Sequence, residues 1–248
     1  MSYIDFGVNF ANIKKYSDTM VASLLTDAKN SGVTHVICIS NSIKECKRNL
    51  YLAKIHPMLY FTAGIHPHNA KEFRQEDIEF LTKLATHPQC IAIGECGLDY
   101  NRNFSTKEQQ IAAFEAQIMV AKNTNKKLYL HCRDSYPEFI EILNKHQYYE
   151  GLVHCFTGDL TQAQVFIKMG FQLGITGWLL DNRRNKKLAH AVTHIGIEHL
   201  IVETDSPWMP IYPAKFSVPQ DVIKIVAEIE RLKGQKCVDR LYQNAMEF

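Results

Sequence analysis

The chain has 248 residues, of which 46% are apolar and 22% charged, and this size and composition suit one large globular domain. Its formal net charge of +2 argues against the broad basic face of a protein that coats long nucleic acid. No apolar run reaches the ~18 residues of a membrane span, and the amino terminus lacks the features of a secretory signal. The seven cysteines include no C-x-x-C pair, which indicates reduced thiols. We therefore expect a cytoplasmic protein that does not enter a membrane.

Short apolar runs that end at polar or glycine-containing segments predict buried parallel strands. Eight such runs lie at Tyr3–Val8, His35–Ser40, Tyr60–Gly64, Ile91–Gly94, Leu128–His131, Leu152–His154, Gln172–Ile175 and Leu200–Glu203. The helical patterns include Ser17–Asn30, Asp77–Thr86, Thr106–Asn125 and Leu160–Met169, with a final helix at Val218–Leu232. Strand and helix alternate eight times without a linker or charge block. The sequence therefore predicts an α/β fold, a single (β/α)8 TIM barrel that spans residues 1–248 as one domain.

Polar residues accompany the ends of the first and third strands. Alternation along the first strand places Asp5, Gly7 and Asn9 on the same side. A polar pair at a strand end is either a pair of ligands or part of an Asx turn, and the pattern does not separate the two. After the third strand, His66 and His68 flank a proline on one loop. This arrangement favours a functional role without identifying which histidine acts.

The fourth strand leads directly into a carboxylate, Glu95. After Glu95 the sequence becomes polar, and a helix begins at the Ser-Thr-Lys-Glu capping pattern of residues 105–108. Glu95 is therefore predicted at the carboxyl end of a barrel strand, where barrel enzymes place their chemistry. A charged residue also commonly marks the point where a strand leaves the core, so Glu95 alone does not establish a site.

Three further strands lead into groups of the same kind. The fifth leads into His131, the sixth into His154, and the eighth is followed by Glu203 and Asp205. Each residue alone has an ordinary structural explanation, such as a helix cap or a solvated side chain. Because the carboxyl ends of barrel strands meet at one face, acid and imidazole groups at four of them predict a divalent metal site. Mixed ligation of this kind suits Zn²⁺, Mn²⁺ or Fe²⁺, whereas a site rich in carboxylate and water suits Mg²⁺.

Several of these residues lie in longer motifs. They are AGIHPH (Ala63–His68), IGECGLDYNRNFS (Ile93–Ser105), LHCRD (Leu130–Asp134), HCFTG (His154–Gly158), GITGW (Gly174–Trp178) and ETDSPW (Glu203–Trp208). With these motifs the chain resembles the TatD-type metal-dependent deoxyribonucleases, within the wider amidohydrolase-like barrels, from Asp5 to about Asn244. The resemblance implies that the metal ligands are Glu95, His131, His154 and Asp205, that Glu203 lies beside the site, and that His66 lies near the metal or the scissile phosphate.

The chain departs from the common family pattern at two places. Most members begin D-x-H-x-H with both histidines on the metal, whereas Gly7 and Asn9 stand there in this chain, as in the branch that names the family. Loss of two imidazoles should weaken one metal subsite and favour oxygen-preferring ions. We therefore expect Mg²⁺ as cofactor, with Mn²⁺ or Zn²⁺ as alternatives. Near the carboxyl end, residues 216–219 read Phe-Ser-Val-Pro in place of an Arg-x-Glu-Pro-like element.

These residues suggest a mechanism. A bound ion would activate a water for attack on a phosphodiester and offset charge on the phosphoryl oxygens. Glu95, His66 and Asp205 are the expected catalytic residues, with Asp205 as the group that orients the water and accepts its proton. Arg102 and Arg133 could contact phosphate together with His66, although Arg133 equally suits a salt bridge within its loop.

An aromatic residue could also contribute to substrate binding. Trp178 follows the seventh strand and could stack on a base, and core packing is an equally supported role for this residue.

The leading interpretation is a monomeric, metal-dependent 3′–5′ exonuclease that acts on the ends of single-stranded DNA or RNA. The low net charge is compatible with an enzyme that holds only a few nucleotides near one strand end. An alternative is the hydrolysis of a small ester or amide, since related barrels use the same ligand geometry. A third is a binding or assembly protein on an inactivated barrel, which the missing histidine pair favours and the retained ligands oppose.

Overall fold

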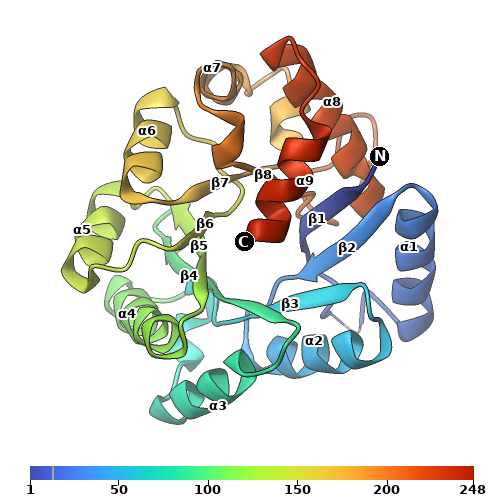
Figure 1. The fold of residues 1–248 in the computed structure, drawn as a ribbon. Coiled ribbons are helices and arrows are strands. Elements are labelled where there is room, and N and C mark those ends of the chain that lie inside the picture. The colour runs from blue at the N-terminus through green and yellow to red at the C-terminus, as the bar shows by residue number, and fades with distance from the viewer. Residues whose placement is uncertain (13) are drawn as a thin grey trace. The chain divides into compact units, whose positions relative to one another are not determined.

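The computed structural model describes residues 1–12 and 14–248. Eight strands form one sheet in the order β1 to β8, the pairs are parallel, and helices lie between successive strands in the sequence (Figure 1). The predicted (β/α)8 TIM barrel is therefore confirmed. That residues 1–248 behave as one domain stays a prediction.

The strands are β1 (Tyr3–Val8), β2 (Val33–Cys38), β3 (Leu59–Ala63), β4 (Cys90–Asp99), β5 (Lys127–Arg133), β6 (Gly151–Val153), β7 (Gln172–Ile175) and β8 (Leu200–Val202). The α-helices are α1 (Asp18–Asn30), α2 (Ile43–Ile55), α3 (Gln75–Ala85), α4 (Lys107–Thr124), α5 (Tyr136–His146), α6 (Leu160–Met169), α7 (Lys186–His194), α8 (Val222–Lys233) and α9 (Val238–Glu247). The short 3₁₀ helices are η1 (Pro67–Glu72), η2 (Gly177–Leu180), η3 (Ile197–His199) and η4 (Pro219–Asp221).

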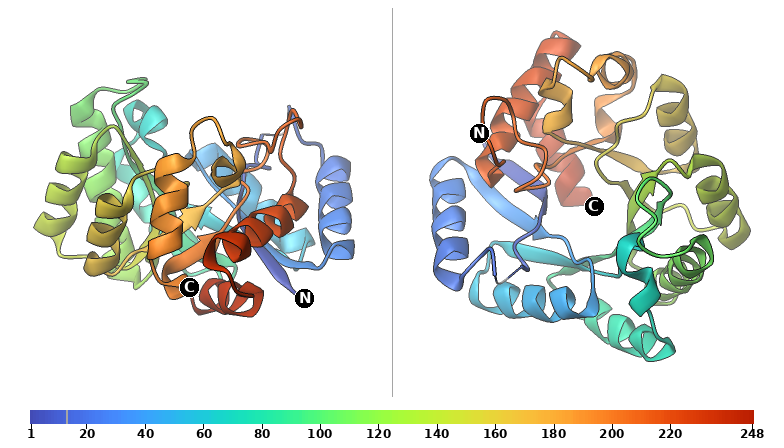
Figure 2. Two further views of the ribbon diagram at one scale, coloured as in Figure 1. Left: turned by 90° about the horizontal axis from the view of Figure 1, so that it is seen from above. Right: turned by 180° about the vertical axis from the view of Figure 1, so that it is seen from behind.

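The chain divides into two compact units, and the first contains residues 1–38 and 155–248. In this unit the end of β8 joins the end of β1, because Asp205 N donates to Gly7 O at 2.8 Å and Asn9 N donates to Ser206 O at 2.7 Å. Helices α8 and α9 pack against β1 and β8, and Figure 2 shows these red helices beside the dark blue strand. Beyond α9, the ring of Phe248 contacts Phe6 of β1 with centroids 4.9 Å apart.

The second unit contains residues 39–154, with β3 to β6 and α2 to α5. Its longest strand pairing joins β4 to β5, from Ala92 opposite Lys127 to Asp99 opposite Arg133. Helices α4 and α5 meet through the stacked rings of Phe114 and Phe139, whose centroids are 5.1 Å apart. This unit carries the candidate residues His66, Glu95, His131 and His154.

Local sequence signals account for several helix ends. At α4 a capping box is present one residue later than predicted, with Thr106 as N-cap accepting from Gln109 N and the Gln109 side chain accepting from Thr106 N. At α6, Asp159 and Gln162 form the same reciprocal arrangement. These caps satisfy backbone donors that the first helical turn leaves without partners.

Several predicted elements differ from the structure. Strand β2 is Val33–Cys38 and not His35–Ser40, and a further helix, α9, follows the helix predicted as the last one. The largest difference concerns β4, which continues to Asp99 instead of stopping at Gly94. The polar and glycine residues after Glu95 resembled a turn, but they pair with β5 as a continuation of the strand.

The structure bears on two expectations from composition. Among residues 1–12 and 14–248, no helix is long and apolar enough to cross a membrane. The seven cysteines all lie in this described part of the chain, and all are free thiols.

Candidate active site

Glu95 lies on a bulge within β4. In the pairing with β5, Gly94 lies opposite Tyr129 and Cys96 lies opposite Leu130, so Glu95 is an extra residue without a partner in the register. A bulge redirects a strand side chain, and bulges are common beside active sites. The carboxylate is therefore presented from inside a long strand, where its backbone is better supported than in a loop.

Two glycines allow β4 to continue past the bulge. Gly94 and Gly97 have φ angles of +144° and +138°, which residues with a side chain rarely adopt. A Cβ atom would lie 2.1 Å from the carbonyl oxygen of Tyr129 at the first position and 2.0 Å from that of His131 at the second. Close approach of β4 to β5 therefore requires glycine on both sides of Glu95.

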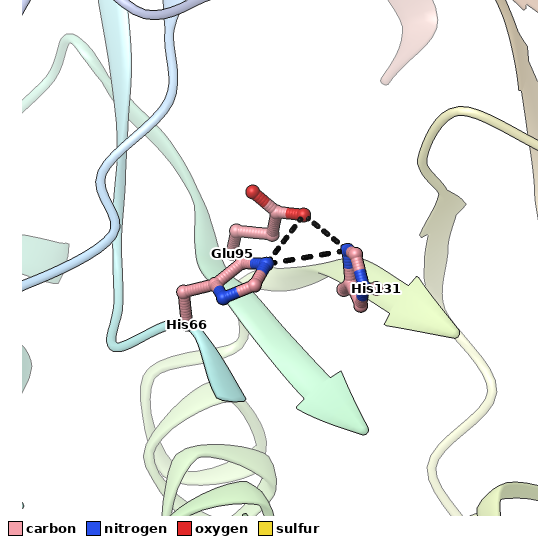
Figure 3. A group of neighbouring side chains, drawn as sticks. All are labelled: His66, Glu95 and His131. Carbon is pink, nitrogen blue, oxygen red and sulfur yellow. Dashed lines mark hydrogen bonds and ion pairs between the residues drawn. The ribbon is translucent and has the colours of Figure 1, made fainter. Parts of the chain in front are cut away.

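Two histidines face the Glu95 carboxylate. His66 is the N-cap of η1, after β3, and His131 lies in β5. Figure 3 shows both rings and the carboxylate pointing toward one another. Glu95 Oε1 lies 2.8 Å from His131 Nδ1 and 3.6 Å from His66 Nε2, and these two nitrogens are 3.3 Å apart.

The hydrogen bonds of His66 indicate which of its nitrogens carries a proton. His68 N donates to His66 Nδ1 at 3.0 Å, so Nδ1 acts as an acceptor. Burial lowers the pKa of His66 to about 3, so the ring is neutral at pH 7. A neutral imidazole has one N–H, which this contact places on Nε2. His66 is thus arranged as a hydrogen-bond donor, and it would have to change tautomer to ligate a metal through Nε2.

Asp99 and His68 extend the cluster behind His131. His131 Nε2 lies 3.1 Å from Asp99 Oδ2, and His68 Nε2 lies 2.8 Å from the same oxygen. The other oxygen, Asp99 Oδ1, accepts backbone N–H groups of Asn101 and Arg102 at 3.0 Å each. A carboxylate on the far nitrogen of a ligand histidine fixes the ring's orientation and tautomer. This contact leaves His131 Nδ1 as the nitrogen that faces Glu95.

The sequence pattern indicated no role for Asp99, and it did not identify whether His66 or His68 is the functional histidine. Asp99 lies in the same motif as Glu95, but a strand that stopped at Gly94 would have placed it in a loop. The sequence feature that could have identified Asp99 is its spacing of four residues from Glu95 within one glycine-containing stretch.

The pKa shifts of the cluster have clear electrostatic causes. Burial opposes ionisation of Glu95, but the imidazoles of His66, His154 and His131 outweigh it and hold the pKa of Glu95 below its usual range. The pKa of Asp99 is also lowered, because hydrogen bonds from His131 and His68 outweigh its burial. Burial alone would lower the pKa of His131, but its bonds to Asp99 and Glu95 raise it to about 9. Two carboxylates thus share one imidazolium.

His154 approaches Glu95 from the end of β6. Its Nε2 lies 4.0 Å from Glu95 Oε1, and its Nδ1 lies 2.8 Å from the hydroxyl of Tyr129. A tyrosine hydroxyl can accept the Nδ1–H of a histidine, and the neutral ring then carries its lone pair on Nε2, the nitrogen on the side of Glu95. The structure therefore brings Glu95, His131, His154 and His66 together within the second unit.

Asp205 lies in the first unit, directly after β8, and its backbone has a φ of +57°. Asn9 Nδ2 donates to Asp205 Oδ1 at 2.8 Å, so the residue that stands in place of a family histidine orients this carboxylate. Close by, Asp5 accepts the backbone N–H and the hydroxyl of Thr204 at 2.8 and 2.6 Å. The roles of Asp205 as ligand and general base stay predictions.

The predicted substrate-binding residues differ in their surroundings. Arg102 and Arg133 are exposed, and neither guanidinium has an ion-pair partner within the described part of the chain; Arg133 is the last residue of β5, and Arg102 follows the paired strand β4. They remain candidates for phosphate contact. Trp178 is half-buried in η2, and the guanidinium carbon of Arg184 lies 3.6 Å from the centre of its ring. One face of this indole is therefore covered by a side chain.

The donor set fits a divalent metal ion. His66 Nε2, Glu95 Oε1 and His131 Nδ1 all lie within 4.8 Å of one another. Imidazole nitrogen and carboxylate oxygen are ligands for Zn²⁺, Mn²⁺ and Fe²⁺, and the carboxylate alone also suits Mg²⁺. Binding through His131 Nδ1 would displace the proton that this atom now shares with Glu95.

The chain is similar to a family of nucleases. It matches the family described as TatD related DNase over residues 4–247. The 3′–5′ ssDNA/RNA exonuclease TatD of Erwinia tasmaniensis is 35% identical to it over 251 residues, covering 98% of this chain and 96% of that protein. The protein of the same name from Salmonella typhimurium is 36% identical over 209 residues, covering 83% and 79%.

Solved structures share the fold. The TatD homologue YjjV of Escherichia coli has a TM-score of 0.88 at 24% identity, covering 99% of this chain and 95% of that chain. A TatD family hydrolase of Entamoeba histolytica has a TM-score of 0.88 at 23% identity, covering 100% and 97%. At these identities the similarity supports the barrel fold alone.

Proposed function

Because the chain belongs to the TatD related DNase family, we propose that it is a metal-dependent 3′–5′ exonuclease that acts on single-stranded DNA or RNA. The observation that carries the proposal is the cluster of Glu95, His131 and His66, with one carboxylate oxygen and two imidazole nitrogens within 4.8 Å of one another. Relatives of nearly the same length carry the exonuclease name, which supports the same reaction class here.

Glu95, His131 and His154 would hold the ion in the second unit, and Asp205 stays the fourth ligand implied by the family pattern. When bound, a divalent ion would activate a water and offset charge on the phosphoryl oxygens. His66 would donate its Nε2–H to an oxygen of the scissile phosphate. Arg102 and Arg133, both exposed, would contact the phosphate backbone. Asp205, oriented by Asn9, would accept the proton of the attacking water.

We propose Mg²⁺ as the ion used in the cell, on the argument that Gly7 and Asn9 replace two imidazoles of the common pattern. The retained imidazole nitrogens should still bind Zn²⁺ and Mn²⁺ more tightly than Mg²⁺, because affinity for such ligands rises along the transition series. Relative affinity and cellular use can differ, since cellular use also depends on metal availability. A cytoplasmic location and a monomeric state complete the proposal.

The test uses purified protein and a single-stranded oligonucleotide that is labelled at its 5′ end. A 3′–5′ exonuclease converts it into a ladder of shorter labelled products, and the same enzyme leaves a closed circular single strand intact. Chelation should abolish cleavage, and Mg²⁺ or Mn²⁺ should restore it. Glu95→Gln should remove activity. Glu115→Gln should retain it, because Glu115 of α4 pairs with Lys145 of α5 outside the candidate site.

Three results would overturn the proposal. They are undiminished cleavage after metal removal confirmed by elemental analysis, efficient cutting of the circular strand, and hydrolysis of simple esters or amides without any action on the oligonucleotide. The last result would establish the small-molecule hydrolase instead. Binding of nucleic acid without turnover by any of these ions would point to the inactivated barrel.

A further inference from the structure

An exposed aromatic cluster lies on the loop after β8. We call residues 207–217 the aromatic loop. Three large aromatic side chains of this loop are exposed to solvent, Trp208 by 54%, Tyr212 by 86% and Phe216 by 59%. Large apolar side chains that gather at the surface mark interaction sites more often than isolated ones do. The loop is therefore a candidate surface for a ligand that covers aromatic rings.

A lysine lies between two of these rings. Lys15 Nζ is 4.7 Å from the centre of the Trp208 ring and 4.9 Å from that of Phe216. The loop adds a second cation, Lys215, and contains no acidic residue. Flat apolar rings beside an ammonium group match a ligand that has a flat ring next to an anion. A nucleotide, with its base and its phosphate, has this chemistry.

The loop is anchored at both ends. Ser217 N donates to Pro207 O at 3.2 Å, Ser206 Oγ donates to Ser217 O at 2.7 Å, and Ser217 Oγ donates to Trp208 O. These bonds tie the backbone of Trp208 to the segment that carries Phe216. Rings that are positioned before binding lose less conformational freedom when a ligand stacks on them.

The same loop is joined to the backbone of the candidate catalytic residue Asp205. Trp208 N donates to Asp205 O at 2.8 Å, so the indole and Asp205 belong to one turn. Trp178, the other tryptophan of the chain, has Arg184 over its ring, as described above. Trp208 is 54% exposed whereas Trp178 is half-buried, so the aromatic loop offers more open aromatic surface than Trp178 does.

We propose that Trp208, Phe216 and Lys15 form a stacking site for single-stranded nucleic acid, in which a base lies on the rings and Lys15 pairs with a neighbouring phosphate. The inference rests on the proposed function, because it names how this protein holds the substrate of that reaction. Stacking tolerates every base, so the site should bind without strong sequence preference.

The first experiment measures binding without catalysis. The full-length protein is titrated into a 5′-fluorescein-labelled oligo(dT) in the presence of chelator, and fluorescence anisotropy gives Kd. Trp208→Ala should raise Kd about 5-fold or more, as expected from removal of one base–aromatic stack. Lys15→Ala should raise Kd and reduce its dependence on salt. The matched control is Tyr51→Ala, which removes an aromatic residue on α2 that is 45% exposed and has Arg48 near its ring.

The second experiment identifies the stacking ring by its own fluorescence. The chain has two tryptophans, so Trp178→Phe leaves Trp208 as the sole indole and Trp208→Phe leaves Trp178. Unlabelled oligo(dT) should quench tryptophan fluorescence in the first variant and leave it unchanged in the second. Because both substitutions retain an aromatic ring, this comparison stays decisive if Trp208→Ala fails to fold.

The outcomes separate this inference from the proposed function. Quenching of Trp208 together with weaker binding by Trp208→Ala supports the stacking site, even if no metal ion restores cleavage, a result that would overturn the exonuclease alone. Equal Kd values for Trp208→Ala and Tyr51→Ala, with no quenching of Trp208, would overturn the stacking site, even if the parent protein cleaves single strands. Quenching of Trp178 in its place would also overturn it.

Discussion

At the scale of single residues, the candidate site depends on how each titratable group is held. His131 lies between two carboxylates, with Nδ1 on Glu95 and Nε2 on Asp99. A histidine in this position needs the second carboxylate to keep its ring in place. We therefore propose that Asp99 acts on the reaction through His131, as a positioning residue.

Replacement of Asp99 by asparagine tests this role. Asp99→Asn should weaken metal binding by about 10- to 100-fold, because the amide holds the His131 ring less firmly. Isothermal titration with Mn²⁺ measures the affinity, and a melting curve in chelator checks that the variant is folded. Asp159→Asn is the control, since Asp159 caps α6 and asparagine is also a good cap. Equal Mn²⁺ affinity in Asp99→Asn and the parent would show that Asp99 does not position His131 for metal binding.

Asp205 should matter for chemistry more than for folding. Asp205→Asn keeps the size of the side chain and removes the charge that would accept a proton, so turnover should fall by about 10²- to 10⁴-fold. Its φ of +57° is tolerated by asparagine, so the backbone should stay intact.

The measurement is turnover on a short oligonucleotide at saturating Mg²⁺, paired with thermal unfolding in chelator. If Asp205 merely shapes the turn before Trp208, then Asp205→Asn should leave turnover within about threefold of the parent, since asparagine serves as well in such a turn. That result would contradict the catalytic role.

At the scale of elements, the bulge of β4 decides where Glu95 and Asp99 lie. The strand passes Glu95 only because Gly94 and Gly97 let its backbone approach β5. Sequence patterns predicted the apolar start of this strand. They did not predict its continuation, because a glycine-rich polar stretch is typical of turns until a neighbouring strand supplies its hydrogen bonds.

Gly97→Ala should therefore disrupt both the fold and the site. Its Cβ would lie 2.0 Å from the His131 carbonyl oxygen at a φ of +138°, so β4 would have to move away from β5. We expect a loss of several kcal/mol in the free energy of unfolding, together with loss of metal binding.

The matched control for this variant is Gly234→Ala, at the C-cap of α8. Its φ is +66°, but no atom lies within 4 Å of the added carbon. It should cost about 1 kcal/mol. Urea unfolding of both variants provides the comparison, and equal losses would show that close approach to β5 is not the constraint.

At the scale of the whole molecule, the buried carboxyl of Asp5 links stability to pH. Burial raises the pKa of Asp5 well above its usual value, although Thr204 and Gly7 donate hydrogen bonds to it. The folded state therefore binds this proton more tightly than the unfolded state does. The resulting stabilisation is present below the unfolded pKa and is lost as the pH rises through the folded pKa.

Asp5→Asn should remove this dependence. Relative to the parent, the variant should become more stable as the pH rises from 4 toward 7, so the unfolding free energy of the variant minus that of the parent should increase. Chemical denaturation in chelator at several pH values measures the difference. The control is Asp239→Asn, which replaces an exposed carboxyl on α9. Parallel pH profiles for Asp5→Asn and the parent would contradict the prediction.

The sequence by itself determined the strand order and showed that Glu95, His131 and His154 each follow the apolar run of a strand. Short apolar runs and the polar residue that follows each of them are local features, and they can be read without knowing any contact. The barrel then follows from regular alternation of strand and helix, as the sheet order from β1 to β8 confirms.

Only the tertiary structure decided how these groups meet. His68 and Asp99 are 31 residues apart, and their contact depends on the register of β4 against β5 and on the loop that begins at His66. The choice of His131 Nδ1 as the nitrogen that faces Glu95 follows from the contact of His131 Nε2 with Asp99. Hydrogen bonds between distant segments depend on strand register and on bulges, and a one-residue shift in register reverses every side chain. A pattern of neighbouring residues does not carry that information.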